Sequence, residues 1–151
     1  EILRCLVGSE MCIRDSYPGA GAAGGMGGGL LAFFNAELKP GTELLLKAID
    51  FSEKIKGADL IITGEGKADR QTAMGKVPYG ILKEAQKEHI PVIVLAGSIE
   101  NLPELNKAGF KGIFSIAPGP ITLEKAMEPE FAKENITRLV SQLYSVITSF
   151  G

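Results

Sequence analysis

Several residue types that build common catalytic and structural sites are scarce in this sequence. Of the 151 residues, one is histidine, two are cysteine and none is tryptophan. The single histidine, His89, argues against a Ser-His-Asp mechanism and against a histidine metal site, and its place near an expected helix end is explained by the helix dipole. Cys5 and Cys12 both lie near the start of the chain, where they can form no disulfide framework for a core and match no zinc spacing. We therefore expect a protein of the reducing cytoplasm.

An excess of basic charge is also absent. The chain has 16 Lys and Arg against 18 Asp and Glu, so it lacks the concentrated basic surface that binding to a phosphate backbone requires, and we expect no nucleic acid as partner. Hydrophobic residues make up 45% of the chain, enough to bury the core of one soluble, enzyme-like domain. Residues 17–36 carry no charge over the length of a membrane span, but only residues 30–34 are strongly apolar, so we expect no membrane partner.

The first 16 residues differ from the rest. They follow neither a helical nor a strand period, and the composition changes abruptly at Tyr17 and Pro18. The segment resembles a peptide that arises when assembled DNA reads are translated through adapter sequence. We expect residues 1–16 to be a non-native leader; a short native tail is the alternative, because disordered termini are common.

Seven glycines fall between residues 19 and 29. They predict a glycine-rich turn that leads into a helix over residues 30–34. The turn contains the spacing G-x-G-x-x-G, but no strand precedes it, so it is not a dinucleotide-binding fingerprint. A second helix is expected to start with Thr42 as its N-cap and to continue to Ile49.

The rest of the chain alternates between short apolar runs and amphipathic segments. Continuous runs rich in Ile and Val predict strands buried on both faces, at residues 58–63, 91–96 and 112–116. Amphipathic segments predict helices between and after them, at residues 78–89, 103–108 and 129–149. This alternation predicts an α/β fold with an open, doubly wound, mainly parallel three-layer sheet over residues 51–151, preceded by the glycine-rich turn and helices of residues 17–50.

Chemically active side chains follow the first expected strand. In such sheets the ligand site lies beyond the carboxyl ends of the strands. The segment 63–71 supplies the carboxylates of Glu65 and Asp69, which suit magnesium or proton abstraction. Gly75 and Lys76 directly precede the next expected helix, where a lysine and free amides suit a phosphate. The alternative is an ordinary solvated surface loop.

Several of these segments together resemble one family, the bacterial type I glycerate kinases. The segments are GAGAAGGMG at residues 19–27, LAFFNAELKPG at 31–41, ITGEGKADRQ at 62–71, GKVP at 75–78, PVIVLAGS at 91–98 and GIFSI at 112–116. The resemblance runs from about Pro18 to the C-terminus. It implies ATP-dependent phosphorylation of D-glycerate, with magnesium and with 2-phosphoglycerate as the favoured product.

The family is built from two α/β domains with the active site in the cleft between them. This chain resembles the final third: residues 17–50 correspond to a remnant of the inserted domain and hinge, and residues 51–151 to the C-terminal part of the kinase. The family segments expected before them are absent, so the resemblance implies that the missing N-terminal part is needed and that this chain alone is inactive.

The resemblance also implies roles for individual residues. Asp69 would hold magnesium or accept the proton of the glycerate hydroxyl, Glu65 would be a second magnesium ligand, and Gln71 would orient the substrate. Lys76 would bind phosphate or carboxylate oxygens. Further substrate- or phosphate-binding positions are expected at glycines and one serine that allow close backbone approach: Gly64, Gly66, Gly75, Gly97, Ser98, Gly24 and Gly25. The alternative function is a non-catalytic α/β module that binds a small phosphorylated or carboxylate ligand through the same loops.

Overall fold

The computed structural model describes residues 17–34, 36–100 and 102–149. The expected leader at residues 1–16 lies outside the described residues. The chain divides into two compact units between Leu45 and Leu46, a few residues before the expected border at residues 50 and 51. Each unit is described by itself below.

The first unit contains the glycine-rich turn and helix α2 (Ala22–Phe34). Ala23, Gly24 and Gly25 have positive φ angles of 52°, 70° and 94°, so the backbone leaves the helical conformation at these three residues before it continues as a helix. Glycine adopts such angles without steric cost. The expected turn and the helix that follows it are therefore both present in one element.

Helix α3 (Gly41–Ala48) follows. Because the helix already begins at Gly41, Thr42 lies in its first turn, and the prediction that Thr42 is the N-cap was wrong. Leu44 and Leu45 of this helix are exposed.

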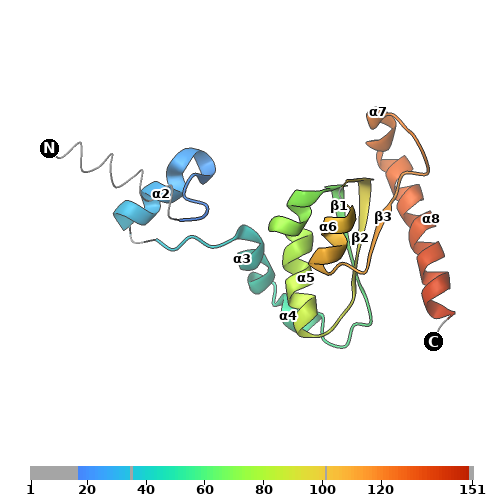
Figure 1. The fold of residues 1–151 in the computed structure, drawn as a ribbon, viewed down its shortest axis with the longest axis horizontal. Helices are drawn as coiled ribbons and strands as arrows, with labels where there is room; N and C mark the ends of the chain where they lie inside the picture. The colour runs from blue at the N-terminus through green and yellow to red at the C-terminus, as the bar shows by residue number, and fades with distance from the viewer. Residues whose placement is uncertain (1–16, 35, 101, 150–151) are drawn as a thin grey trace. The chain divides into compact units, whose positions relative to one another are not determined.

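The second unit is built on a parallel sheet of three strands in the order β1-β2-β3 (Figure 1). The strands are β1 (Ile61–Ala68), β2 (Val92–Ile99) and β3 (Gly112–Ser115). The connections contain the 3-10 helix η1 (Arg70–Met74), α5 (Val77–Lys87) and α6 (Leu102–Ala108). The remaining helices are α4 (Phe51–Lys54), α7 (Leu123–Ala126) and α8 (Pro129–Thr148).

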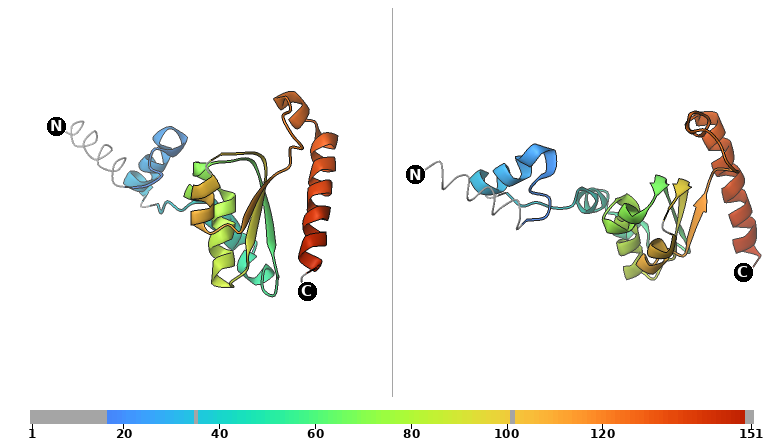
Figure 2. Two further views of the ribbon diagram at one scale, coloured as in Figure 1. Left: turned by 45° about the vertical axis from the view of Figure 1, so that its right-hand side comes forward. Right: turned by 45° about the horizontal axis from the view of Figure 1, so that its top comes forward.

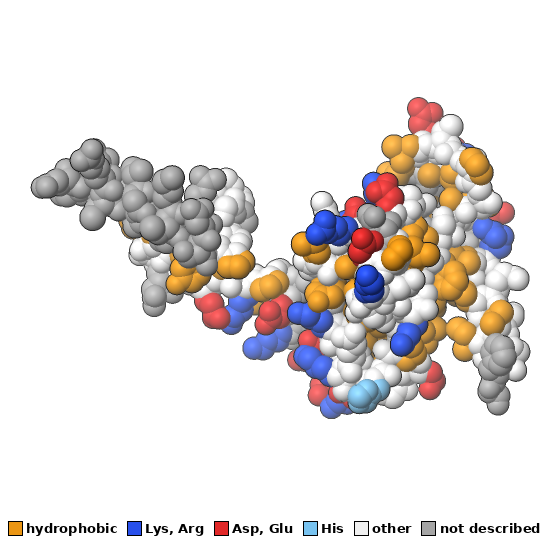
Figure 3. Space-filling model, in the orientation of Figure 1, with side chains coloured by type: hydrophobic (Ala, Val, Ile, Leu, Met, Phe, Trp, Pro, Cys, Tyr) orange, Lys and Arg blue, Asp and Glu red, His pale blue; other side chains and the backbone are white. Residues whose placement is uncertain are grey.

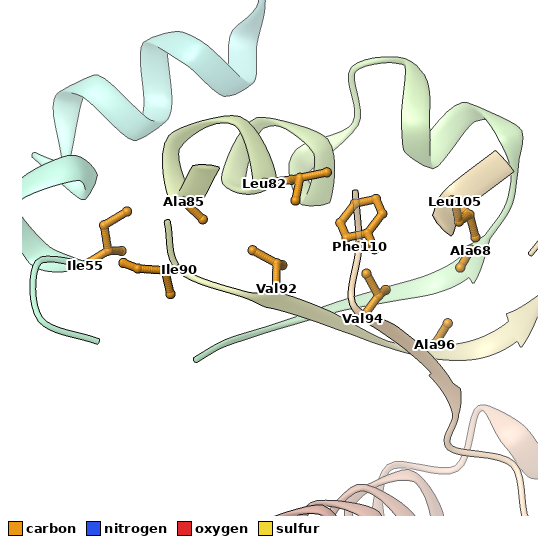
Figure 4. Close-up of a cluster of buried hydrophobic side chains, with 10 residues drawn as sticks. All are labelled: Ile55, Ala68, Leu82, Ala85, Ile90, Val92, Val94, Ala96, Leu105 and Phe110. Carbon is orange, nitrogen blue, oxygen red and sulfur yellow. The ribbon is translucent and has the colours of Figure 1, made fainter. Parts of the chain in front are cut away.

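The sheet lies between two layers of helices. Helices α5 and α6 cover one face, and α8 lies on the other side of the sheet (Figure 2). Alternate residues of β2 face the two layers. Val92, Val94 and Ala96 pack with residues of α5, α6 and the loop before β3 in one buried cluster (Figure 4). Ile93 and Leu95 are also buried but do not belong to this cluster, and the alternation of side chains along a strand assigns them to the opposite face. The predicted α/β fold with a parallel, three-layer arrangement is confirmed.

The main difference from the expected elements concerns the length of the strands. β1 continues five residues beyond Thr63, to Ala68, so Gly64, Glu65 and Gly66 belong to the strand and not to a loop. β2 likewise includes Gly97 and Ser98. Residues of β1 remain paired with β2 as far as Ala68 and Ile99. The backbone ladder thus extends the strands through glycine and charged residues, where the apolar pattern had ended.

Three short helices were not expected. Helix α4 lies before β1, η1 lies between β1 and α5, and α7 lies between β3 and α8, all in segments for which no helix was predicted. Within the described residues, no helix combines the length and apolar character needed to cross a membrane.

Candidate functional site

The residues singled out after the first strand converge at the carboxyl end of β1. Glu65 lies in the strand, Asp69 follows its last residue, and η1 turns the chain back so that Lys76 stands directly before α5. The Lys76 Nζ atom lies 3.0 Å from Glu65 Oε1 and 3.5 Å from Asp69 Oδ1. We call Glu65, Asp69, Thr72 and Lys76 the acid–lysine cluster.

The cluster is partly shielded from solvent. The side chains of Glu65 and Asp69 are 15% and 21% exposed, and that of Lys76 is 36% exposed. Two carboxylates and one ammonium in such a place interact more strongly than on an open surface, because water screens them less. The arrangement differs from the alternative of an ordinary solvated loop.

Asp69 is held by its role at the start of η1. It is the N-cap of that helix, and its Oδ1 accepts a hydrogen bond of 2.9 Å from the Gln71 amide. The predicted orienting residue Gln71 therefore contributes its backbone to the cluster. The Asp69 amide in turn donates to Thr72 Oγ1 at 3.0 Å, which completes a capping box.

Thr72 was missed when the sequence was considered alone. Its hydroxyl donates to Glu65 Oε2 at 2.7 Å and its side chain is fully buried. The spacing of Asp69 and Thr72 is that of a capping box, so the pattern D-R-Q-T contained a local signal. The bond to Glu65 depends on the strand reaching as far as Glu65 and could not be inferred from spacing.

Lys76 is the N-cap residue of α5, next to Val77 and Pro78 in the first turn. The hydrogen bond to Glu65, reinforced by the negative charges of Glu65 and Asp69, outweighs desolvation and raises the pKa of Lys76 above its ordinary value. Lys76 is therefore charged at neutral pH. A cation at the N-terminus of a helix is a suitable place for an anionic oxygen, because the helix dipole favours negative charge there.

The other predicted positions are distributed over the two units. Gly75 ends η1 beside Lys76, and Gly97 of β2 lies against β1, where an added Cβ would be only 2.8 Å from the carbonyl oxygen of Gly66. Ser98 is opposite Lys67 in the ladder. Gly24 and Gly25 belong to the first unit and form the bend of α2.

Magnesium is the metal expected at the carboxylates of the acid–lysine cluster. Among the described residues, no group of three or more His, Cys, Asp or Glu side chains is arranged to hold a metal. Magnesium in phosphoryl-transfer sites needs fewer protein ligands, since one or two carboxylates suffice when phosphates and water complete the shell. A single cationic group, the Lys76 ammonium, contacts both Glu65 and Asp69, so these two carboxylates fit that chemistry.

The visible surface of the second unit carries charges of both signs. In Figure 3, Lys and Arg side chains lie interspersed with Asp and Glu side chains across the described residues of this face. Such a surface differs from the continuous basic patch that nucleic-acid-binding proteins present.

We expect Asp69 to titrate below the ordinary aspartate value of 3.8. Desolvation alone raises the pKa of this carboxyl, but the hydrogen bond from the Gln71 amide and the charge of Lys76 together lower it. As the pH falls, the Asp69 carboxyl of the unfolded chain therefore takes up a proton at a higher pH than that of the folded chain. The stabilisation from Asp69 is lost as the pH falls below about 4. Carbon-13 NMR titration of the Asp69 carboxyl measures this. A midpoint at or above 3.8 would contradict it, and Lys76→Met, as control, should move the midpoint upward.

Comparison with known proteins places the chain in a family. The profile of the glycerate kinase family matches residues 4–148, a range that begins inside the segment 1–16, whose origin stays a prediction. A glycerate kinase of Bacillus cereus is 43% identical over 136 residues, which cover 89% of this chain and 35% of that protein. The glycerate 2-kinase of Escherichia coli is 43% identical over 127 residues, which cover 83% of this chain and 32% of that protein.

A solved structure gives the same result. The crystal structure of a protein assigned as glycerate kinase 2 from Salmonella typhimurium LT2 matches with a TM-score of 0.65 and 37% identity, covering 87% of this chain and 33% of that one. The chain thus spans about a third of the length of the relatives it matches. The family profile covers nearly the whole sequence, and the chain belongs to the glycerate kinase family.

Proposed function

We propose that this chain supplies part of the active site for ATP-dependent phosphorylation of D-glycerate, with 2-phosphoglycerate as the product. The observation that carries the proposal is the Lys76 ammonium, held between Glu65 and Asp69 at the start of α5. Support for the 2-phosphate comes from the E. coli relative, which is a glycerate 2-kinase. We place the reaction in the cytoplasm, where ATP is available and the two cysteines stay reduced.

Phosphoryl transfer depends on positioning and on charge neutralisation more than on covalent chemistry by the protein. In the reaction, the glycerate hydroxyl oxygen forms a bond to the γ-phosphorus of ATP while the bond from that phosphorus to the bridging oxygen of ADP breaks. Asp69 accepts the hydrogen bond of the attacking hydroxyl and takes its proton, and the neighbouring Gln71 orients the substrate. The lowered pKa of Asp69 keeps its carboxylate ionised at neutral pH, the form in which it can accept a proton.

Lys76 is assigned to the oxygens of the transferred phosphate or of the glycerate carboxylate. Its charge neutralises negative charge there, as a phosphate-binding lysine does in other kinases. Glu65 and Asp69 are the residues that would hold magnesium, which when bound neutralises charge on the ATP phosphates. Backbone amides near Gly64, Gly66, Gly75, Gly97 and Ser98, together with Gly24 and Gly25, are proposed as further contacts to substrate or phosphate.

We further propose that the 151-residue chain is inactive without additional protein. Its matches to relatives cover about a third of their length. Large apolar side chains are exposed on both α2 and α3, among them Phe33, Phe34, Leu44 and Leu45. Exposed apolar groups of this size are typical of surfaces that another part of a protein covers, here the N-terminal part of a longer kinase.

A chimera tests the proposed function. Residues 17–149 of this chain replace the matching third of the E. coli glycerate 2-kinase, and ATP-dependent formation of 2-phosphoglycerate is measured. We expect the chimera to be active, and we expect Lys76→Met to raise KM for ATP about 10- to 150-fold, because one charged contact to phosphate is worth about 1.5–3 kcal/mol.

The matched control for Lys76→Met is Lys133→Met, an exposed lysine of α8 outside the cluster, which should leave KM unchanged. A folded chimera without kinase activity that still binds ATP or glycerate in calorimetry would favour the alternative, a non-catalytic binding module. An unchanged KM and kcat in Lys76→Met would remove Lys76 from the site.

A further inference from the structure

The Thr72 hydroxyl connects the two acidic residues of the cluster. It accepts a hydrogen bond from the Asp69 amide at 3.0 Å and donates one to Glu65 Oε2 at 2.7 Å. The two acids come from different elements, since Glu65 lies in β1 and Asp69 caps η1. A single oxygen atom therefore links the strand to the turn that follows it.

The second of these bonds is not required by the turn. A capping box needs the Thr72 oxygen only as an acceptor for the Asp69 amide. A hydroxyl has one proton to donate, and Thr72 directs it to Glu65. A hydrogen bond to a carboxylate is shorter and stronger than one between neutral groups, so the bond restrains the Glu65 side chain.

Thr72 is itself firmly held. Its side chain is 0% exposed, and η1 packs against both α5 and α6. Threonine is also stiff at χ1 because it is branched at Cβ. The hydroxyl is thus a rigid reference point, whereas Glu65 has three rotatable bonds and would otherwise have several rotamers open to it.

We propose that Thr72 is a positioning residue that fixes the Glu65 carboxylate relative to Asp69 and Lys76, so that both carboxylates contact the Lys76 ammonium. The proposal rests on the proposed function for its catalytic consequence. Thr72 touches neither substrate nor phosphate in this scheme and acts only through Glu65 and the Asp69 backbone.

Two substitutions separate the hydroxyl from the rest of the side chain. Thr72→Val keeps the shape and removes both hydrogen bonds, whereas Thr72→Ser keeps the hydroxyl and removes the methyl group. A matched control is Thr63→Val, because Thr63 is a buried threonine in β1 that is not part of the cluster. Circular dichroism of each variant reports whether the fold is retained.

The first readout uses the 151-residue chain and does not depend on activity. Hydrogen exchange of the Asp69 amide should become about tenfold faster in Thr72→Val, because this amide loses its acceptor. It should stay close to the original rate in Thr72→Ser and in Thr63→Val. Equal rates in Thr72→Val and the unmodified chain would overturn the proposal.

The second readout is turnover in the chimera. We expect kcat to fall about 10- to 100-fold in Thr72→Val, the effect of a small misplacement of catalytic groups, with KM for ATP changed much less and with recovery in Thr72→Ser. A Thr72→Ser variant as slow as Thr72→Val would overturn the proposal, since the methyl group and not the hydroxyl would then matter. If the unmodified chimera were inactive, the proposed function would fail, and amide exchange would still decide whether the Thr72 hydroxyl holds the Asp69 amide, the contact on which the link to Glu65 depends.

Discussion

Replacing Asp69 with asparagine should lower kcat of the chimera about 100- to 10,000-fold, the range over which general acid–base groups contribute. Asparagine has nearly the same shape and retains a carbonyl oxygen that can accept the 2.9 Å hydrogen bond from the Gln71 amide. It lacks the negative charge that would accept the substrate proton, help to hold magnesium and interact with Lys76 at 3.5 Å. Steady-state kinetics with saturating ATP and glycerate measure the effect.

The asparagine variant separates catalysis from capping. Asparagine is as good an N-cap as aspartate, whereas alanine costs about 0.5–2 kcal/mol at such a position. We expect Asp69→Asn to lose less stability than Asp69→Ala, because asparagine keeps the capping oxygen and loses only the interaction of the charge with Lys76, and we expect Asp69→Ala to lose both stability and activity. If Asp69→Asn retained full kcat and Asp69→Ala did not, Asp69 would be a structural cap and the catalytic assignment would be wrong.

The beginning of β1, most of β2 and all of β3 were predictable because their cause is local. The runs at residues 58–63, 91–96 and 112–116 are apolar on both faces, and short runs of this kind are typical of strands that helices cover on both sides. The extensions of β1 and β2 had a different cause. Gly64, Glu65 and Gly66 carry no strand pattern. The segment is extended because β2 pairs with Gly64, Glu65 and Lys67, a contact between segments about thirty residues apart.

Three of the four members of the acid–lysine cluster stood out in the sequence, whereas Thr72 and the geometry of the cluster did not. Asp69 and Lys76 stand out because acidic and basic side chains follow the end of a buried strand, where α/β sheets bind ligands. The salt bridge from Lys76 to Glu65 requires η1 to turn the chain back. The sequence of η1 has no periodic apolar pattern from which a helix could be predicted. Thr72 was overlooked because a buried hydroxyl acts through its partners, and these become visible only when the chain is folded.

A second large effect is expected at the contact between β1 and β2. Gly97→Ala should lower the free energy of unfolding of the 151-residue chain by about 1–3 kcal/mol, the usual cost of forcing an extra group into a packed core. The added Cβ would lie 2.8 Å from the carbonyl oxygen of Gly66, closer than carbon and oxygen can approach without repulsion. Because this oxygen belongs to the backbone and cannot rotate away as a side chain could, the two strands must move apart. Urea denaturation measures the loss.

Gly64→Ala is the matched control for Gly97→Ala. An added Cβ at Gly64 would meet the Leu95 carbonyl oxygen at 3.8 Å, which is ordinary van der Waals contact, and alanine lowers the entropy of the unfolded chain. We expect Gly64→Ala to leave stability unchanged or to raise it slightly. If both variants lost stability equally, the cause would be a general requirement for glycine in these strands. If only Gly97→Ala did, the cause would be the close approach of β1 and β2 at Gly66 and Gly97.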